Sequence, residues 1–258
     1  MAPFVAEVVA SGLMGAALNS LGGAAFLLGP KARDLGAEAY LPAGIALEEA
    51  LPIGLMFGWL AFFFSGPFAW ASRGSVMNPC VLVLQRAAGG IGTGELVKGL
   101  LAVVLGTTLG VIAVREAFLA SGIPELHPAA VMKPITHSVD SQTAAAAEAA
   151  VAAIVLLFGS FVAPLFGAFG GLVTAAFYCA VFIQEKCTYT CAVMNPAAIL
   201  ALHIASLQDL GAARQVLLGP AVWESMAPYW GGACAGGLAV GLVLRASAWL
   251  FKPKTKRD

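Results

Sequence analysis

The tripeptide Met-Asn-Pro occurs twice in this chain, each time in a loop-like stretch of a very apolar sequence. The two copies are Met77-Asn78-Pro79-Cys80 and Met194-Asn195-Pro196-Ala197. Asn is a favoured helix N-cap and Pro fits best at the first helical position, so each copy predicts the start of a helix. The two predicted helices, 78–88 and 196–206, are too short to cross a bilayer core of about 30 Å at about 1.5 Å per residue. Paired half-helices of this kind indicate re-entrant segments that meet near the membrane midplane.

The composition places the chain in a membrane. Its residues are 60% hydrophobic and only 11% charged, which is not typical of a soluble domain of 258 residues. The formal net charge is zero, so a nucleic-acid partner is not expected. The predicted spans carry no nucleophile–base set and no cluster of metal ligands, so we expect neither an enzyme nor a metal or cofactor. The five cysteines form no metal-binding pattern and are interpreted as small buried thiols.

The hydropathy pattern predicts six membrane spans. The uncharged stretch 149–184 is too long for one span, and Gly159-Ser160 to Pro164 marks its division into spans four and five. The remaining spans are predicted at 5–29, 43–65, 95–118 and 227–250. Each half of the chain therefore runs span, span, half-helix, span. Three spans per half force the halves into opposite orientations, so the predicted fold is an all-α membrane protein with six transmembrane helices and two re-entrant half-helices in an inverted repeat.

The predicted organisation has four parts. They are a first repeat at 1–119, a connecting loop at 120–142, a second repeat at 143–250 and a basic tail at 251–258. Small residues spaced by four predict close helix crossings at Gly106/Gly110, Gly167/Gly171 and Gly232/Gly236.

This arrangement resembles the aquaporins, the major intrinsic protein family. Besides the duplicated Asn-Pro motifs, it has a Glu near the start of the first and fourth spans, Glu7 and Glu148. The segment Tyr189–Ala197 is similar to the family's second motif, and Tyr229-Trp230-Gly231-Gly232 resembles the opening of its sixth helix. The resemblance covers almost the whole chain. It implies a homotetramer in the lipid bilayer, with a pore in each protomer and no cofactor.

The departures from the family pattern bear on selectivity. Cys80 ends the first motif in place of Ala, which resembles the unorthodox or superaquaporin branch, although that branch has a Cys where this chain has Ser206. The filter Arg that follows the family's second motif is Ala198 here. Counting from the motifs places the other constriction positions at Phe57, Ile183 and Ala192. The resemblance therefore implies an apolar constriction that is wider than in a water-specific aquaporin.

The half-helices suggest how such a pore would select its solutes. The N-terminus of each carries about half a positive charge and would face the pore centre, which raises the barrier to protons and cations. The pore motif comprises Asn78, Pro79, Cys80, Asn195, Pro196 and Ala197, and both Asn side chains can donate to a passing water or hydroxyl oxygen. The alternative for these motifs is ordinary helix capping with no pore.

Glu7 and Glu148 lie inside predicted spans, where a charge is expensive. The resemblance implies that these carboxylates accept hydrogen bonds from loop backbone N–H groups and hold the re-entrant loops. The alternative is that both are carboxylates at the membrane edge.

Two functions compete at this point. The first is a passive channel for water or small neutral solutes such as glycerol and hydrogen peroxide. The second is an aquaporin-fold protein with a non-conducting pore that acts as a structural or assembly subunit. The absent filter Arg fits both, whereas the presence of both Asn residues favours the channel. A secondary transporter is a third alternative, but it would place ionisable groups near the midplane.

The basic tail predicts the topology. Four of the last seven residues are Lys or Arg, which places the C-terminus in the cytosol, and six spans place the N-terminus there too. The connector with Lys31 and Arg33 then lies outside, against the positive-inside rule. Residues 254–258 also fit the K-x-K-x-x pattern that retrieves membrane proteins to the endoplasmic reticulum. The alternative is a flank that only sets topology, in a protein of another internal membrane or the plasma membrane.

Overall fold

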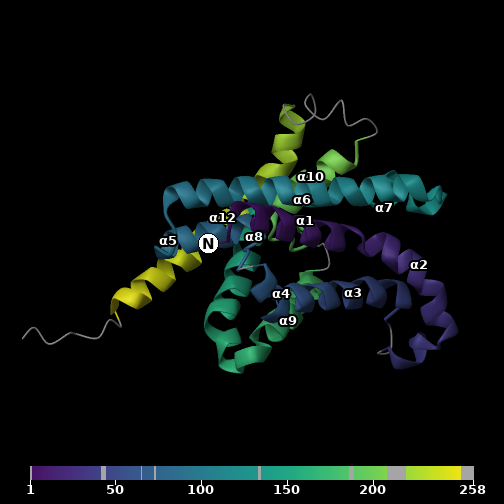
Figure 1. Ribbon diagram of the computed structural model, residues 1–258, viewed down its shortest axis with the longest axis horizontal. Helices are drawn as coiled ribbons and strands as arrows, with labels where there is room; N and C mark the ends of the chain where they lie inside the picture. The colour runs from purple at the N-terminus through teal and green to yellow at the C-terminus, as the bar shows by residue number, and fades with distance from the viewer. Residues whose placement is uncertain are drawn as a thin grey trace, which may run out of the picture.

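The computed structural model is all-helical over the part of the chain that it describes. Helices account for 83% of the structure and the described residues contain no strand (Figure 1). The described residues are 2–41, 45–64, 66–72, 74–132, 135–185, 189–207 and 219–250.

Over its described residues, the first part of the chain forms six α-helices. They are α1 (Phe4–Asn19), α2 (Leu21–Asp34), α3 (Leu47–Phe64), α4 (Gly66–Ala71), α5 (Pro79–Ala88) and α6 (Thr93–Ser121), with a short 3-10 helix at Ala37–Tyr40. The first span was predicted as one helix, but the chain bends by 48° between α1 and α2. At this bend Asn19 donates to the carbonyl of Gly15, and Ser20 donates to that of Ala17. Such side-chain bonds to nearby carbonyls compete with the helical ladder, which accounts for the bend.

The described part of the remainder contains the second short helix and three long helical stretches. After a 3-10 turn at Pro124–Leu126 come α7 (Pro128–Val131), α8 (Ser141–Leu157), η3 (Phe158–Val162), η4 (Ala163–Phe169), α9 (Gly170–Glu185), α10 (Pro196–Ala205) and α12 (Pro220–Leu250). Helix α12 begins seven residues before the predicted sixth span. Asp140 caps α8, because its carboxylate accepts bonds from the backbone N–H groups of Gln142 and Thr143 at 3.0 Å each.

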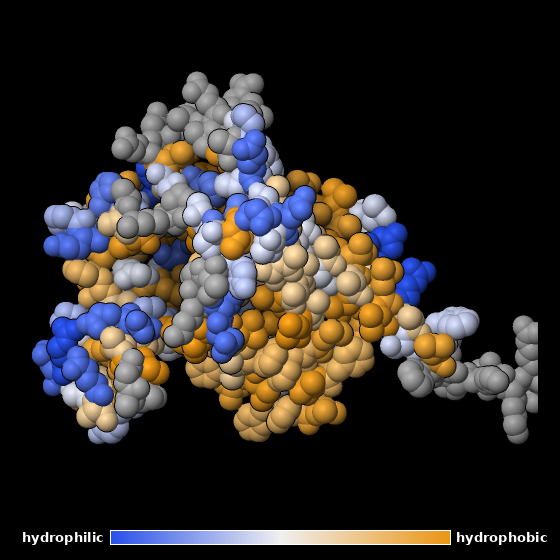
Figure 2. Space-filling model, turned by 180° about the vertical axis from the view of Figure 1, so that it is seen from behind, coloured by the Kyte–Doolittle hydropathy of each residue, from blue (hydrophilic) through white to orange (hydrophobic). Residues whose placement is uncertain are grey.

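Several helices are long and apolar enough to cross a membrane. Four helical runs among the described residues meet this condition, and the bent pair of α1 and α2 raises the number to five. Figure 2 shows hydrophobic residues across much of the central and lower part of one face. The protein is therefore an all-α membrane protein with several spans.

One of the four runs, Ser141–Glu185, is divided internally. Its 45 residues would measure about 68 Å as one straight helix, more than twice the thickness of a bilayer core. The chain turns back below α8 through η3 and η4 (Figure 1), and Gly167 has a φ of 55° at the turn. The rings of Phe158 and Phe177 stack with centroids 3.9 Å apart, which joins the end of α8 to α9. Gly167 was predicted as a helix-crossing residue, but its role is in this turn.

The long helices pack in pairs that join distant parts of the chain. Helix α1 lies along α6, and α8 lies along α12. Each short helix contacts the last long helix of the opposite half, α5 against α12 and α10 against α6. Helix α3 lies against α9. These contacts bring the two short helices together in the interior of the molecule.

Glycines allow the paired helices to approach closely, as predicted for Gly106/Gly110 and Gly232/Gly236. A Cβ atom on Gly110 would lie 2.0 Å from the carbonyl oxygen of Gly12, and one on Gly232 would lie 2.3 Å from that of Ala145. A Cβ atom on Gly171, in α9, would likewise lie 2.0 Å from the carbonyl oxygen of Phe64, in α3. The backbones themselves are therefore in contact at these crossings, as in other small-residue membrane interfaces.

We expect Gly110→Ala to destabilise the packing of α1 on α6, because the added methyl group overlaps backbone atoms that cannot rotate away. Gly94→Ala is the matched control on the same helix, since no atom lies within 4 Å of its Cβ position. The control adds no clash and should keep about the stability of the wild type. Thermal unfolding in detergent measures both changes, and a Gly110→Ala protein as stable as the wild type would contradict this packing.

Candidate functional site

The two short helices begin in the same way. The side-chain oxygen of Asn78 accepts a bond from the backbone N–H of Cys80 at 3.0 Å, and that of Asn195 accepts from Ala197 at 3.2 Å. Pro79 and Pro196 are the first residues of α5 and α10. Each Asn therefore satisfies one of the N–H groups that a helix start leaves without a partner.

The residue before each Asn has an unusual backbone conformation. Met77 has a φ of 57° and Met194 a φ of 53°, both in the left-handed region that favours glycine. Cys191 and Ala192, at 65° and 47°, share this conformation in the second loop. Each such residue costs about 1–3 kcal/mol and persists only where the surroundings enforce it.

Glu7 stabilises the first loop from within α1. Its side chain is buried and accepts bonds from the backbone N–H groups of Met77 at 2.7 Å and of Val76 at 3.0 Å. Ser11 Oγ donates to the same carboxylate at 3.4 Å, one helical turn further along α1. The carboxylate thus satisfies buried donors that the left-handed turn at Met77 would otherwise leave unpaired.

Glu148 makes the corresponding contacts from α8 to the second loop. Its side chain is fully buried, and its two oxygens accept bonds from Val193 N at 3.0 Å and Met194 N at 2.9 Å. The structure therefore places both carboxylates in the interior, against the backbone of the two loops, and neither is exposed at the edge of the helical bundle.

A hydrogen bond between described residues joins the two loops. Asn195 Nδ2 donates to the backbone carbonyl of Met77 at 3.1 Å. Within the described residues, Asn78 Nδ2 makes no corresponding bond. Two N–H groups of Asn78 and one of Asn195 therefore stay available to a molecule at this point, whereas both side-chain oxygens serve as caps.

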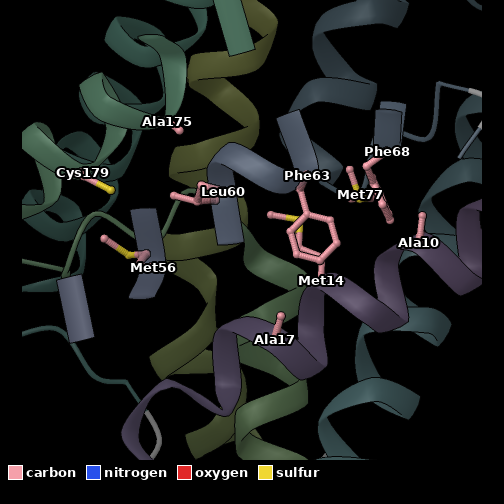
Figure 3. Close-up of a cluster of buried hydrophobic side chains, with 10 residues drawn as sticks. All are labelled: Ala10, Met14, Ala17, Met56, Leu60, Phe63, Phe68, Met77, Ala175 and Cys179. Carbon is pink, nitrogen blue, oxygen red and sulfur yellow. The ribbon is translucent and has the colours of Figure 1, made fainter. Parts of the chain in front are cut away.

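A cavity of about 650 Å³ surrounds the pair, and both Asn78 and Asn195 line it. It extends to Asn19 and Leu21 at the bend between α1 and α2, and to Ser160 in the turn between α8 and α9. Its wall is mostly apolar. Met14, Leu60, Phe63 and Met77 belong both to this wall and to the buried cluster drawn in Figure 3, where Phe63 lies beside Met14.

The predicted constriction residues fall in different places. Ala198 lines the cavity, whereas Phe57, Ile183 and Ala192 are not among its lining residues. Ile183 is 40% exposed and Ala192 is fully buried. The lining positions are occupied instead by sequence neighbours, namely Met56, Phe182, Cys191 and Val193. Of the other motif residues, Pro79, Cys80, Pro196 and Ala197 are buried behind the wall.

Two residues that stabilise the second loop were not predicted. The hydroxyl of Tyr178, on α9, donates to the carbonyls of Ala192 at 2.9 Å and Val193 at 3.2 Å. Glu185 Oε1 accepts from the backbone of Tyr189 at 2.6 Å and Thr190 at 2.8 Å. No sequence pattern distinguishes Tyr178, which lies in a continuous uncharged run. Glu185 is the first charged residue after that run, and this position is a recognisable signal in the sequence.

Arg115 stabilises the far end of α10 and was also not predicted. It is only 7% exposed, and it donates to the carbonyls of Ala205 at 3.1 Å and Leu207 at 3.0 Å. Its guanidinium also pairs with Glu116. A cation at a helix C-terminus satisfies orphan carbonyls and complements the helix dipole. The sequence signal for Arg115 is its position inside a predicted apolar span, because an ionisable residue there usually has a specific partner.

The cysteines differ in part from their interpretation as small buried thiols. Cys191 is disulfide-bonded rather than a free thiol, whereas Cys80, Cys179 and Cys234 are free, and Cys187 lies outside the described residues. His203 is a buried residue of α10, and its Nε2 atom lies 3.1 Å from Ser225 Oγ.

The chain matches no protein-family model and no curated protein. Within the described residues, no group of three or more His, Cys, Asp or Glu side chains could hold a metal ion.

Proposed function

We propose that the protein is a passive channel for water and small neutral solutes, of the aquaporin type. The observation that carries this proposal is that Asn78 and Asn195, at the starts of two short helices, line one cavity and are joined through Met77. The cavity's extent, from the α1–α2 bend to the α8–α9 turn, supports a continuous path past this pair.

The proposed selectivity follows from the charges at the pair. The N-termini of α5 and α10 each contribute about half a positive charge, and both would oppose a cation in the cavity. A neutral solute instead accepts bonds from the available N–H groups of Asn78 and Asn195. Glu7 and Glu148 are not among the residues that line the cavity, and their oxygens accept bonds from loop backbone N–H groups.

We further propose six spans in an inverted repeat. Counting α8 and α9 separately adds one span to the five that α1–α2 and the other long runs supply. The contact pairs support two equivalent halves, since α1 with α6 matches α8 with α12, and α5 with α12 matches α10 with α6. By the resemblance to aquaporins, four such protomers associate in the bilayer.

Stopped-flow light scattering on proteoliposomes tests the proposal. Vesicles that contain the protein should shrink faster than protein-free vesicles in a hyperosmotic solution of an impermeant solute, with no rise in proton conductance. Glycerol and hydrogen peroxide uptake should be measured on the same vesicles. Folded protein with no permeability above background would reject the channel and favour the alternative of a non-conducting structural or assembly subunit.

The topology and address of the protein are proposed from its tail, residues 251–258, which lies outside the described residues. An even number of spans and the basic tail put both termini in the cytosol. We expect Lys254→Ser with Lys256→Ser to move a tagged protein from the endoplasmic reticulum to the surface of a eukaryotic cell, because the retrieval signal requires both lysines. Microscopy with surface biotinylation measures this. Unaltered protein already at the surface would contradict retrieval, and Lys252→Ser is the matched control.

A further inference from the structure

We propose that the cavity is also a binding site for an uncharged amphiphile, a molecule with an apolar body and an oxygen acceptor at one end. The inference rests on the proposed function in one respect, namely that the same cavity is the solute path. An occupant of this kind would block that path and so regulate it.

The size of the cavity is the first argument. A water molecule takes up about 30 Å³ of liquid, so a path for water needs far less than the 650 Å³ present. Small-molecule sites occupy about 300–1,000 Å³ and bury most of their ligand, so this cavity lies in their range.

The lining is the second argument. Helices α1 and α3 contribute a continuous apolar wall from Met14, Met56, Leu60, Phe63 and Phe64. Such a wall offers a passing water no hydrogen-bond partner, but it matches an alkyl chain or ring through apolar burial. A few placed polar groups in an otherwise apolar cavity are the usual composition of a small-molecule site.

The hydrogen-bonding groups at the centre define the polar end of the ligand. Asn78 and Asn195 present available N–H donors, while their side-chain oxygens cap helices. The nearby carbonyl of Met77 already accepts from Asn195, and those of Ala192 and Val193 accept from Tyr178. The centre therefore supplies free N–H donors, while each of these three carbonyls already accepts one hydrogen bond. A ketone, ether or amide oxygen fits it, whereas an ammonium group has only donors and is opposed by two helix N-termini.

Photolabelling tests this site on the reconstituted full-length protein. The probe is a nonyl chain with a terminal methyl ketone and a mid-chain diazirine, and mass spectrometry locates the labelled residues. Labels on Met14, Leu60 or Phe63 that excess 2-nonanone removes would support the site. Nonane should compete about two- to tenfold more weakly, because it lacks the acceptor. Nonylammonium should not compete.

A pair of variants on α3 provides the control. Leu60→Trp fills the cavity and should abolish the competable labelling, whereas Phe62→Trp changes an exposed side chain two residues away and should leave it intact. If Leu60→Trp does not fold, the labelling map of the wild-type protein still decides. Labels found only on exposed residues would overturn the inference. So would competition by nonane and nonylammonium that equals the competition by 2-nonanone.

Flux measurements separate this inference from the proposed function. Saturating 2-nonanone should lower the water permeability of wild-type and Phe62→Trp proteoliposomes and leave protein-free vesicles unaffected. Competable labelling without any permeability would leave the binding site standing and reject the channel. Permeability without competable labelling would support the channel and reject the binding site.

Discussion

Replacing Glu148 with Ala is expected to remove nearly all solute permeability and much of the folded protein. The change leaves the backbone N–H groups of Val193 and Met194 buried without an acceptor, at a cost of about 1–3 kcal/mol each. It also releases the left-handed turn at Met194, which places Asn195 at the cavity. Stopped-flow permeability and thermal unfolding in detergent measure the two losses.

Two further variants make this result specific. Glu148→Gln retains one oxygen acceptor and should keep an intermediate permeability, because only one of the two backbone bonds is lost. Glu49→Ala removes an exposed carboxylate at the start of α3 and should behave as the wild type. Full permeability in a stable Glu148→Ala protein would show that the carboxylate does not hold the second loop.

The second large effect is expected from Ala198→Arg. Ala198 lines the cavity three residues after Asn195, so an Arg there adds bulk and five donors beside the path. Glycerol permeability should fall by about tenfold, which corresponds to about 1.4 kcal/mol in the barrier, and water permeability should fall much less. Uptake of both solutes by the same proteoliposomes measures the ratio.

A matched substitution separates bulk from charge. Ala198→Met adds an unbranched side chain without donors, so it should lower glycerol permeability without introducing a charge. If Arg and Met have equal effects, the constriction selects by width alone. An unchanged solute profile in both variants would place the narrowest point elsewhere, for example at Met56 or Phe182.

The elements that local signals define were predictable from the sequence. The half-helices predicted at 78–88 and 196–206 correspond to Pro79–Ala88 and Pro196–Ala205, because an Asn cap followed by Pro fixes a helix start by itself. The bend after Asn19 was missed, since one Asn and one Ser in an apolar run do not reveal whether their side chains bond the preceding turn.

The side chains around the cavity were less predictable. Counting from the motifs gave Phe57 and Ile183, whereas the wall contains Met56 and Phe182. A shift of one residue turns a helical side chain by about 100°, so counting along the sequence does not decide which of two neighbours faces the cavity. The contacts of Tyr178 and Arg115 depend on which helices lie side by side, and no local pattern encodes that.

The bond from Asn195 to the carbonyl of Met77 makes the two loops energetically dependent on each other. Glu7 determines where that carbonyl lies, because it binds the N–H of the same residue, yet Glu7 belongs to the other half of the chain from Asn195. A double-mutant cycle between Glu7→Gln and Asn195→Ala should therefore be non-additive. A substitution in one loop during evolution would in turn restrict the substitutions that the other loop tolerates. The two copies of the motif are therefore expected to have changed together.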